Sequence, residues 1–254
     1  MIKFSLITPL RNQHDLFETL MHTLKNSTEN PKEVEVLICV DDDDIPTINK
    51  TETWKEKYTF TNLEFFIVKR SEHFTRDYVN FLAKKAQGRF VMNINADSEF
   101  VTHHWDDRIY KAMDKACQSS GDEVWMGLVK DGLRRDGEDK LFPNFSCWPL
   151  VSKSSIDFLG YFLDERFKIW GPDHFIVQPY RRLNRLVSLT HVLIDHNSVH
   201  SGKRVSDGNF ERFHKIDTEN PFVLTEEVVM DSVDRLLACI RHQKGQHDLN
   251  IDNI

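Results

Sequence analysis

Polar residues that can bind cations or accept protons stand directly behind two apolar runs of this sequence. The run at 34–40 (VEVLICV) leads into Asp41–Asp44, and the run at 90–94 (FVMNI) leads into Asn95 and Asp97. In a parallel α/β sheet, ligands bind in the crevice beyond the carboxyl ends of the strands. Carboxylate oxygens are also the ligands that hard divalent cations prefer. Both acidic stretches therefore predict a ligand-binding site at one edge of a sheet.

The segments around these acids alternate between strand-like and helix-like patterns. Leu16, Leu20 and Leu24 repeat every four residues, as on one face of a helix. A second helix, with its apolar side at 78–86, is expected to stop at Gly88. Runs rich in β-branched and aromatic residues indicate strands at 4–7, 34–40, 63–68 and 90–94. This order is typical of a mainly parallel sheet with helices on its faces.

The remaining chain extends this layer and adds two polar loops. Further elements are expected as a helix at 105–116, strands at 124–129 and 186–194, and a last helix at 225–241. The charged segments 131–140 and 201–209 contain glycines and are predicted to be loops. One apolar stripe on the last helix indicates docking against the core and consists of Val229, Val233, Leu236 and Ile240.

The composition is that of a soluble globular protein. The 254 residues are 40% hydrophobic and carry a net charge of −7, which disfavours a surface built mainly to coat nucleic acid or anionic membrane. No apolar run approaches the about 18 residues of a membrane span. The four scattered cysteines form no CxxC pair, and reduced core thiols are expected, with Cys39 inside a strand. These features predict a cytoplasmic location.

Several common catalytic motifs are absent from the sequence. There is no GxxxxGK[ST] phosphate loop, no GxGxxG after the first strand, and neither GxSxG nor HExxH. The first strand is followed instead by TPLRN at 8–12, which disfavours P-loop and dinucleotide chemistry. His103 and His104 follow the second acidic stretch, but adjacent residues at a helix start point in different directions. Solvent-facing or packing roles are therefore expected for both.

Five stretches, in this order and spacing, resemble one family. They are FSLITPLRNQHDLFETL at 4–20, VLICVDDDD at 36–44, GRFVMNINADSEF at 88–100, GYFLDERFKIWGPDHF at 160–175 and SVHSGKR at 198–204. Together they resemble GT-A-fold nucleotide-sugar glycosyltransferases, in particular family 2 and the animal β-1,4-galactosyltransferase group. The resemblance covers most of residues 4–205 and depends on the order of motifs that are each short.

The resemblance implies both an architecture and an activity. The implied fold is α/β, a GT-A (Rossmann-like) mainly parallel sheet flanked by helices, in a single domain with an acceptor-side extension. The implied boundaries are a domain at 1–224, divided into a nucleotide-binding half at 1–104 and an acceptor-binding half at 105–224, and a C-terminal helix and tail at 225–254. The implied activity is an inverting, metal-dependent transfer of sugar from a nucleoside diphosphate, with a UDP-sugar expected, to a hydroxyl acceptor.

The resemblance also implies a divalent metal site. Asp97 resembles the second acid of the family's D-x-D signature, and Mn²⁺ or Mg²⁺ is the implied cofactor. Asn95 replaces the first acid and adds no charge, so a weaker site is expected. His200 resembles the late histidine that completes the metal shell in the galactosyltransferase-like members, with His196 as a second candidate. A simple turn or helix cap is the alternative interpretation of the N-A-D run.

Asp173 in W-G-P-D resembles the acid that ends the family's W-G-G-E-D motif. That acid is the catalytic base, which takes the proton of the acceptor hydroxyl during an inverting transfer. Pro172 stands where the family has Glu. Asp173 as the cap of a helix starting at His174 is an alternative that is compatible with catalysis. Trp170 is the implied acceptor contact, stacking on a sugar face, and a core tryptophan is the alternative.

Donor contacts are implied on both sides of the predicted crevice. Asp41 resembles the acid that binds the base or ribose, and the other members of its acidic run are expected to be solvated. Asn95 is expected near the ribose. The loop cations Lys203 and Arg204 are implied on the diphosphate, or are else simply solvated. The remaining implied donor contacts are Pro9, Arg11, Phe74 against the base and Arg76 on the diphosphate.

Two other functions stay open at this point. A sugar-1-phosphate nucleotidyltransferase shares a similar sheet, although such enzymes carry a glycine-rich basic loop after the first strand, which TPLRN lacks. A non-catalytic nucleotide-sugar-binding protein on a degenerate scaffold is suggested by Asn95 and Pro172. The expected partners are a nucleotide-sugar donor and a glycan acceptor, with nucleic acid or protein hydroxyls also open. The sequence predicts no oligomeric state.

Overall fold

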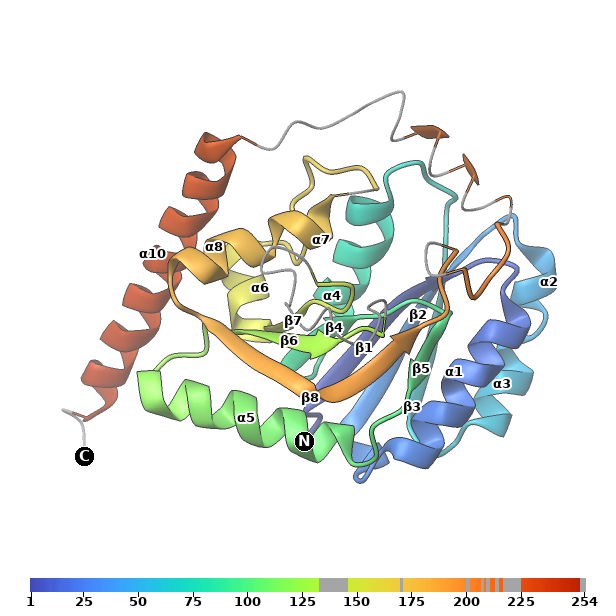
Figure 1. Cartoon of the computed structure of the whole chain (residues 1–254), viewed down its shortest axis with the longest axis horizontal. Coiled ribbons are helices and arrows are strands. Elements are labelled where there is room, and N and C mark those ends of the chain that lie inside the picture. The colour runs from blue at the N-terminus through green and yellow to red at the C-terminus, as the bar shows by residue number, and fades with distance from the viewer. Residues whose placement is uncertain are drawn as a thin grey trace.

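A mixed sheet with helices on both faces organises the chain (Figure 1). The computed structural model describes residues 1–132, 146–169, 171–199, 202–206, 208, 211–212, 215–216 and 225–251. In these residues eight strands lie side by side in the order β3-β2-β1-β4-β7-β6-β8-β5. Their bounds are β1 (Phe4–Leu10), β2 (Val34–Asp41), β3 (Asn62–Val68), β4 (Phe90–Asn93), β5 (Ser98–Phe100), β6 (Met126–Lys130), β7 (Leu150–Ser152) and β8 (Leu186–His196).

Parallel pairing dominates this sheet, as the sequence predicted. β1 pairs in parallel with β2 and with β4, β2 pairs in parallel with β3, and β6 with β8. The strand β7 runs antiparallel between β4 and β6, and β5 runs antiparallel to β8. The carboxyl ends of β1, β2 and β4 therefore meet at one edge, and both acidic stretches of the sequence leave the sheet there.

Helices cover both faces of the sheet. Their bounds are α1 (His14–Ser27), η1 (Pro31–Glu33), α2 (Ile45–Ile48), α3 (Thr51–Lys57), the π-helix η2 (Thr75–Asn80), α4 (Phe81–Lys85), α5 (Trp105–Ser120), α6 (Lys153–Leu159), α7 (Pro172–Phe175), α8 (Val177–Arg182) and α10 (Glu226–Ile251). The side chains of α1, α3 and α5 pack with one set of strand residues, and those of α4, α6, α8 and α10 pack with the other set.

Two hydrophobic cores follow from the alternation of side chains along each strand. Phe4 and Leu6 of β1 point into the first core and Ile7 into the second. Every residue of β2 is buried, because both of its faces are covered. Cys39 lies in this strand, as expected for a core thiol, and burial raises its pKa.

Gly88 does not end a helix, and that expectation was wrong. The helix α4 already ends at Lys85. Gly88 is required by close packing instead, because a Cβ at this position would lie 2.6 Å from the carbonyl carbon of Phe4 and from the nitrogen of Ser5. The glycine thus lets the chain enter β4 directly beside β1.

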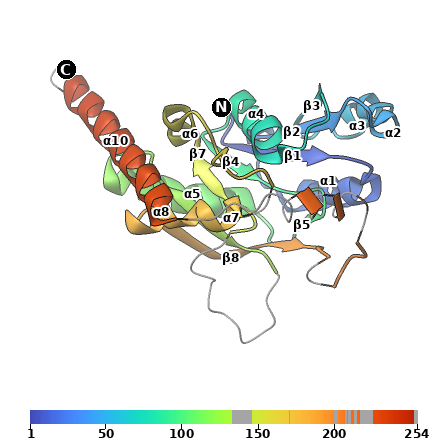
Figure 2. The ribbon, with the colours of Figure 1, turned by 90° about the horizontal axis from the view of Figure 1, so that it is seen from above.

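The C-terminal helix is longer than the sequence predicted. α10 ends at Ile251 rather than near residue 241. Its expected apolar stripe is buried against the core and consists of Val229, Val233, Leu236 and Ile240. Figure 2 shows its far end projecting from the body of the molecule. No helix in the described part of the chain is long and apolar enough to cross a bilayer.

Candidate active site

A cavity of about 500 Å³ opens at the carboxyl edge of the sheet, between the two predicted halves of the chain. Its walls come from the ends of β1, β2, β4 and β8 and from the segment before α7. Nine of the candidate site residues from the sequence line it, namely Pro9, Arg11, Asp41, Phe74, Asn95, Asp97, Asp173, His196 and Arg204. The fold therefore brings together residues that lie up to 195 positions apart, from Pro9 to Arg204.

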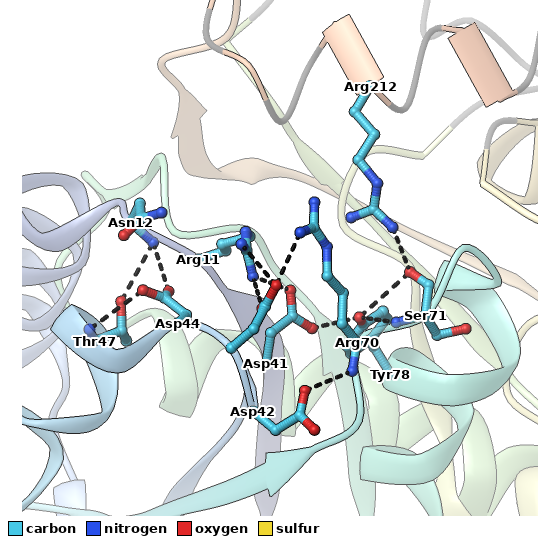
Figure 3. A network of polar contacts seen from close by, with 11 residues as sticks. Arg11, Asn12, Asp41, Asp42, Asp44, Thr47, Arg70, Ser71, Tyr78 and Arg212 are labelled. Carbon is cyan, nitrogen blue, oxygen red and sulfur yellow. Dashed lines mark hydrogen bonds and ion pairs between the residues drawn. The ribbon is translucent and has the colours of Figure 1, made fainter.

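A polar network closes the cavity at the ends of β1 and β2 (Figure 3). Arg11 Nη1 lies 2.8 Å from Asp41 Oδ2, and the hydroxyl of Tyr78 donates to Asp41 Oδ1. The same hydroxyl accepts a hydrogen bond of 2.7 Å from the backbone N–H of Ser71. Burial raises the pKa of Tyr78, so its hydroxyl keeps the proton that it shares with the carboxylate. Asp41 is thus held through both of its oxygens.

Asp43 is not merely solvated, which corrects the expectation for the acidic run. Arg11 Nη1 donates to Asp43 Oδ1, and Arg70 Nη1 lies 2.9 Å from Asp43 Oδ2. The hydrogen bond from Arg11, supported by Arg70, lowers the pKa of Asp43 to about 2. The backbone N–H of Arg70 also donates to Asp42 Oδ1 over 3.1 Å. The run therefore binds two arginines at the rim of the cavity.

Asp44, at the end of the same run, has a structural role. Its side chain is almost fully buried, and it accepts hydrogen bonds from the backbone N–H of Asn12 at 2.9 Å and of Thr47 at 3.3 Å. The second bond caps the short helix α2, and the first ties it to the loop after β1. Asn12 has a φ of 52°, a left-handed conformation that asparagine tolerates well. This contact fixes the backbone that carries Arg11.

A tight turn after β4 presents Asp97 to the cavity. The carbonyl oxygen of Asn95 accepts hydrogen bonds from the backbone N–H of Ser98 at 3.1 Å and from its hydroxyl at 2.7 Å. The turn that was the alternative interpretation of N-A-D therefore exists. It is built from backbone and Ser98, and the side chains of Asn95 and Asp97 still line the cavity. The turn and the binding role are compatible.

Two basic side chains face Asp97 from the second half of the chain. His196 Nε2, at the end of β8, lies 3.3 Å from Asp97 Oδ1, and Arg204 Nη2 lies 3.5 Å from Asp97 Oδ2. The imidazole of His196 packs against the Trp148 ring, with 4.7 Å between ring centroids. The aspartate itself is only 5% exposed. Its charge is therefore balanced by groups that approach from a different part of the sequence.

The oxygen and nitrogen atoms around this aspartate can be compared with the needs of a divalent cation. Within the described residues, Asp97 Oδ1 and Asn93 Oδ1 are buried oxygens that accept no hydrogen bond. The 3.3 Å between Asp97 Oδ1 and His196 Nε2 is close to the about 3 Å that separates neighbouring ligands at bond lengths of about 2.1 Å. The described residues contain no group of three or more His, Cys, Asp or Glu arranged for a metal. The donor set fits a cation that also takes ligands from phosphate.

Asp173 lies in the first turn of α7 and is not its N-cap. The helix begins at Pro172 with Gly171 as N-cap, in a left-handed conformation with φ of 94°. The Asp173 carboxylate accepts a hydrogen bond of 3.0 Å from the N–H of His174 and otherwise lines the cavity. Burial raises the pKa of Asp173, opposed by the nearby His174 and His196. A carboxylate with a raised pKa is a better proton acceptor.

Asn80 anchors the segment that leads to Asp173. Its side-chain oxygen accepts hydrogen bonds from the N–H groups of Phe162 and Leu163 at 3.0 and 2.9 Å, and its amide donates to the Leu163 carbonyl at 2.8 Å. The N–H of Thr75 donates to the carbonyl of Lys168 over 3.0 Å. The π-helix η2 therefore supports the segment before Asp173 on one side, while Tyr78, from the same turns, holds Asp41 on the other.

Some predicted residues lie elsewhere. Arg76 does not line the cavity, because its guanidinium is exposed and pairs with the neighbouring Asp77 at 2.7 Å. Lys203 does not line it either and pairs with Asp195. Trp170 and His200 are outside the described residues. Sequence reasoning missed Tyr78 and Asn93 as cavity residues, because both had been assigned only to the apolar pattern of their element.

His103 and His104 are exposed and lie outside the cavity, as expected from the sequence. His104 is the residue before α5, has a left-handed φ of 58°, and pairs through Nδ1 with Glu29. The ring of His103 lies beside it, with 6.4 Å between the centroids. Neither histidine lines the cavity.

Comparison with known proteins gives matches among solved structures. No family model and no curated protein matches the sequence. TarS 1–349 of S. aureus in complex with UDP has a TM-score of 0.58 at 18% identity, over 93% of this chain and 71% of that one. The mannosyltransferase PcManGT from Pyrobaculum calidifontis, in complex with GDP-Man and Mn²⁺, has a TM-score of 0.57 at 13% identity, over 96% and 75%.

A third neighbour shares less of its own length with this chain. GalNAc-T7 with UDP, GalNAc and Mn²⁺ has a TM-score of 0.59 at 12% identity, over 77% of this chain and 43% of that one. At these identities the matches establish the fold. The expected GT-A (Rossmann-like) architecture is confirmed, while membership of family 2 or the β-1,4-galactosyltransferase group stays a prediction.

Proposed function

We propose that this protein is an inverting glycosyltransferase that uses a nucleoside-diphosphate sugar and a divalent cation. The observation that carries the proposal is that Asp97 and Asp173, from separate halves of the chain, face one cavity that also contains the Arg11–Asp41 pair. The donor class follows from the neighbours, which were solved with UDP, UDP-GlcNAc or GDP-Man. A UDP-sugar is the expected donor.

The network at the ends of β1 and β2 would hold the nucleotide. Asp41 is fixed by Arg11 and Tyr78, so its remaining lone pairs are presented in one direction to an N–H or hydroxyl donor. Phe74 and Pro9 supply apolar surface beside it for a base. Asn95, on the neighbouring turn, offers an amide to the ribose. Such a preorganised wall binds the donor without having to rearrange.

The diphosphate would lie toward Asp97. Asp97 and His196 would hold Mn²⁺ or Mg²⁺, with Asn93 or Asn95 as an additional oxygen donor, and phosphate would complete the shell. When bound, the cation stabilises the charge that develops on the leaving diphosphate. Arg204 lies beside Asp97 and can donate to phosphate oxygens in a bidentate manner. PcManGT and GalNAc-T7 were solved with Mn²⁺.

Asp173 would act as the base. It accepts the proton of the acceptor hydroxyl while that oxygen bonds to the sugar carbon, and the diphosphate leaves from the opposite face with the electrons of the broken bond. Direct displacement of this kind inverts the configuration at the sugar carbon. The raised pKa of Asp173 suits this role, because a more basic carboxylate gains more from taking the proton.

The activity is tested by incubating the protein with UDP-sugars and candidate glycan acceptors in Mn²⁺, and measuring released UDP. Turnover is expected with Mn²⁺, to be lost with EDTA, and to fall below detection in Asp97→Ala. Full turnover and unchanged metal dependence in Asp97→Ala would contradict the assignment of Asp97.

The same samples separate the two other functions. Pyrophosphate released from a nucleoside triphosphate and a sugar phosphate would indicate a nucleotidyltransferase. Calorimetry that shows tight UDP-sugar binding in EDTA, without turnover on any acceptor, would indicate a binding protein.

A further inference from the structure

Two consecutive residues of the 202–206 segment, Lys203 and Arg204, form ion pairs at the rim of the cavity. Asp195 and His196 are neighbours on a strand, so their side chains point to opposite faces. Across from them, Lys203 Nζ lies 2.7 and 2.6 Å from the two carboxylate oxygens of Asp195. Arg204, the next residue, reaches inward to Asp97. Lys203 and Asp195 therefore form an outer pair, outside the cavity, and Arg204 and Asp97 form an inner pair, inside it.

The outer pair is held in place by its surroundings. Asp195 is paired in register with Glu99 of β5, so its backbone is fixed between strands. Gly132 lies against its side chain, and a Cβ at residue 132 would come within 1.8 Å of Asp195 Oδ1. The Lys203 side chain is 39% exposed and that of Asp195 is 21% exposed. A lysine bonded to both oxygens of a confined carboxylate is restricted in the directions that it can take.

The inner pair depends on where the 202–206 segment lies. Arg204 Nη2 is 3.5 Å from Asp97 Oδ2, which is a long contact for an ion pair. A shift of the segment away from the cavity would lengthen this contact further and weaken it. Within the described part of the segment, the contact between Lys203 and Asp195 ties the residue directly before Arg204 to β8.

We propose that Lys203 and Asp195 form a positioning pair, which holds Arg204 beside Asp97 so that its guanidinium meets the diphosphate of the donor. This inference rests on the proposed function for the nature of the ligand. It assigns Lys203 a role different from direct phosphate contact, and it makes Asp195 a functional residue although Asp195 does not line the cavity.

The two roles of Lys203 give opposite results in charge-exchange variants. If Lys203 positions Arg204, Lys203→Ala and Asp195→Asn each weaken binding of UDP with Mn²⁺ about fivefold, and the exchange Asp195→Lys/Lys203→Asp restores it to within about twofold. If Lys203 contacts phosphate directly, Asp195→Asn has no effect and the exchange is the weakest variant. Either of those results would overturn the proposal.

A double-variant cycle shows whether Lys203 acts through Arg204. In an Arg204→Ala background, Lys203→Ala is expected to change the Kd for UDP by less than about twofold, because the group that it positions is gone. Full additivity of the two substitutions would overturn the proposal. The matched control is Lys57→Ala, which breaks an ion pair of the same 2.6 Å length with Glu18 away from the cavity, and should leave the Kd unchanged.

A measurement without ligand separates this inference from the proposed function. Amide hydrogen exchange of residues 202–206 is expected to rise at least about fivefold in Lys203→Ala and to stay unchanged in Lys57→Ala. Unchanged exchange in Lys203→Ala would overturn the positioning pair, whatever the protein binds. Faster exchange in a protein that binds neither UDP nor a UDP-sugar would support the pair and contradict the proposed function.

Discussion

A carboxylate is buried at each of the two edges of the parallel sheet, and the two carboxylates differ in their hydrogen bonding. At the amino edge, Glu35 is 4% exposed and its Oε1 accepts hydrogen bonds from the Ser5 hydroxyl at 2.5 Å and from the N–H of Gln87 at 2.6 Å. At the carboxyl edge, Asp97 is 5% exposed and its Oδ1 accepts no hydrogen bond from the described residues. Glu35 and Asp97 are therefore buried to a similar extent, but only the Glu35 oxygen accepts hydrogen bonds from the described residues.

The difference distinguishes a carboxylate that stabilises the fold from one that is kept for a ligand. Burying a charge is costly unless hydrogen bonds or an opposite charge compensate it. The cost of burying the Glu35 charge is compensated by hydrogen bonds from Ser5 and Gln87, which lie in or close to the paired strands β1 and β4. Among the described residues, Asp97 is faced by His196 and Arg204, at distances of 3.3 and 3.5 Å. We expect a cation to be the missing partner.

The largest expected effect concerns Asp173, the other acid of the carboxyl edge. Asp173→Asn removes the proton acceptor while keeping the size of the side chain, so kcat should fall about 10²–10⁴-fold. The Kd for UDP with Mn²⁺ should change less than about twofold, since the proposed base would face the acceptor rather than the nucleotide. Asp157→Asn, an exposed carboxylate on α6, is the matched control and should be fully active. Retained turnover in Asp173→Asn would exclude it as the base.

The second effect is on stability at the amino edge. Glu35→Ala leaves the hydroxyl of Ser5 and the N–H of Gln87 without their acceptor, so the free energy of unfolding should fall by about 2–4 kcal/mol. Urea denaturation measures the loss, and Glu52→Ala at an exposed position is the control. The comparison fails if Asp97→Ala destabilises the protein as much as Glu35→Ala does.

A smaller loss of stability is expected from Gly88→Ala. The added methyl group would overlap the backbone of β1 at 2.6 Å, and backbone cannot rotate away as a side chain can. Overpacking of this kind costs about 1–3 kcal/mol. Urea denaturation of Gly88→Ala beside Gly208→Ala, where a Cβ would have open space, measures the effect. Equal stability of the two variants would refute the packing argument.

The smallest effect comes from the raised pKa of Asp173. The raised pKa of Asp173 in the folded state means that folding favours its protonated form over its charged form. The stability that protonation contributes is fully present below the unfolded pKa of about 3.9 and is lost as the pH rises through the folded pKa. Asp173→Asn should therefore raise the Tm at pH 7 and leave it nearly unchanged at pH 3. Calorimetry at both pH values checks the sign, and a lower Tm at pH 7 would contradict it.

Local pattern was enough to predict most of the sheet. The runs at 4–7, 34–40 and 63–68 became β1, β2 and β3 because their residues are apolar on both faces, and the leucines at every fourth position formed α1. The antiparallel insertion of β7 between β4 and β6 was not predicted, because three buried residues carry too little periodicity. The same holds for Gly88, whose need for space arises from a strand 83 positions earlier, at Ser5.

Site residues could be predicted from the sequence only where a short motif itself contains the polar side chain. Asp41, Asp97 and Asp173 all line the cavity. Asp41 ends β2 and Asp97 follows β4 at the carboxyl edge, whereas Asp173 lies in the first turn of α7. Tyr78 was not predicted as a partner of Asp41, since an aromatic residue on an apolar helix face gives no sign that its hydroxyl is used. The pairing of Lys203 with Asp195 was equally hidden, because it depends on how β8 and the following segment meet.

The central claim is tested most directly by calorimetry of UDP binding in Mn²⁺, comparing the wild-type protein with Asp97→Asn. The account predicts Mn²⁺-dependent binding in the wild type that is abolished by EDTA, and a loss of at least about thirtyfold in Asp97→Asn, since the substitution removes the one acid of the predicted metal site. Equal affinities of the two proteins, with the same response to EDTA, would contradict it.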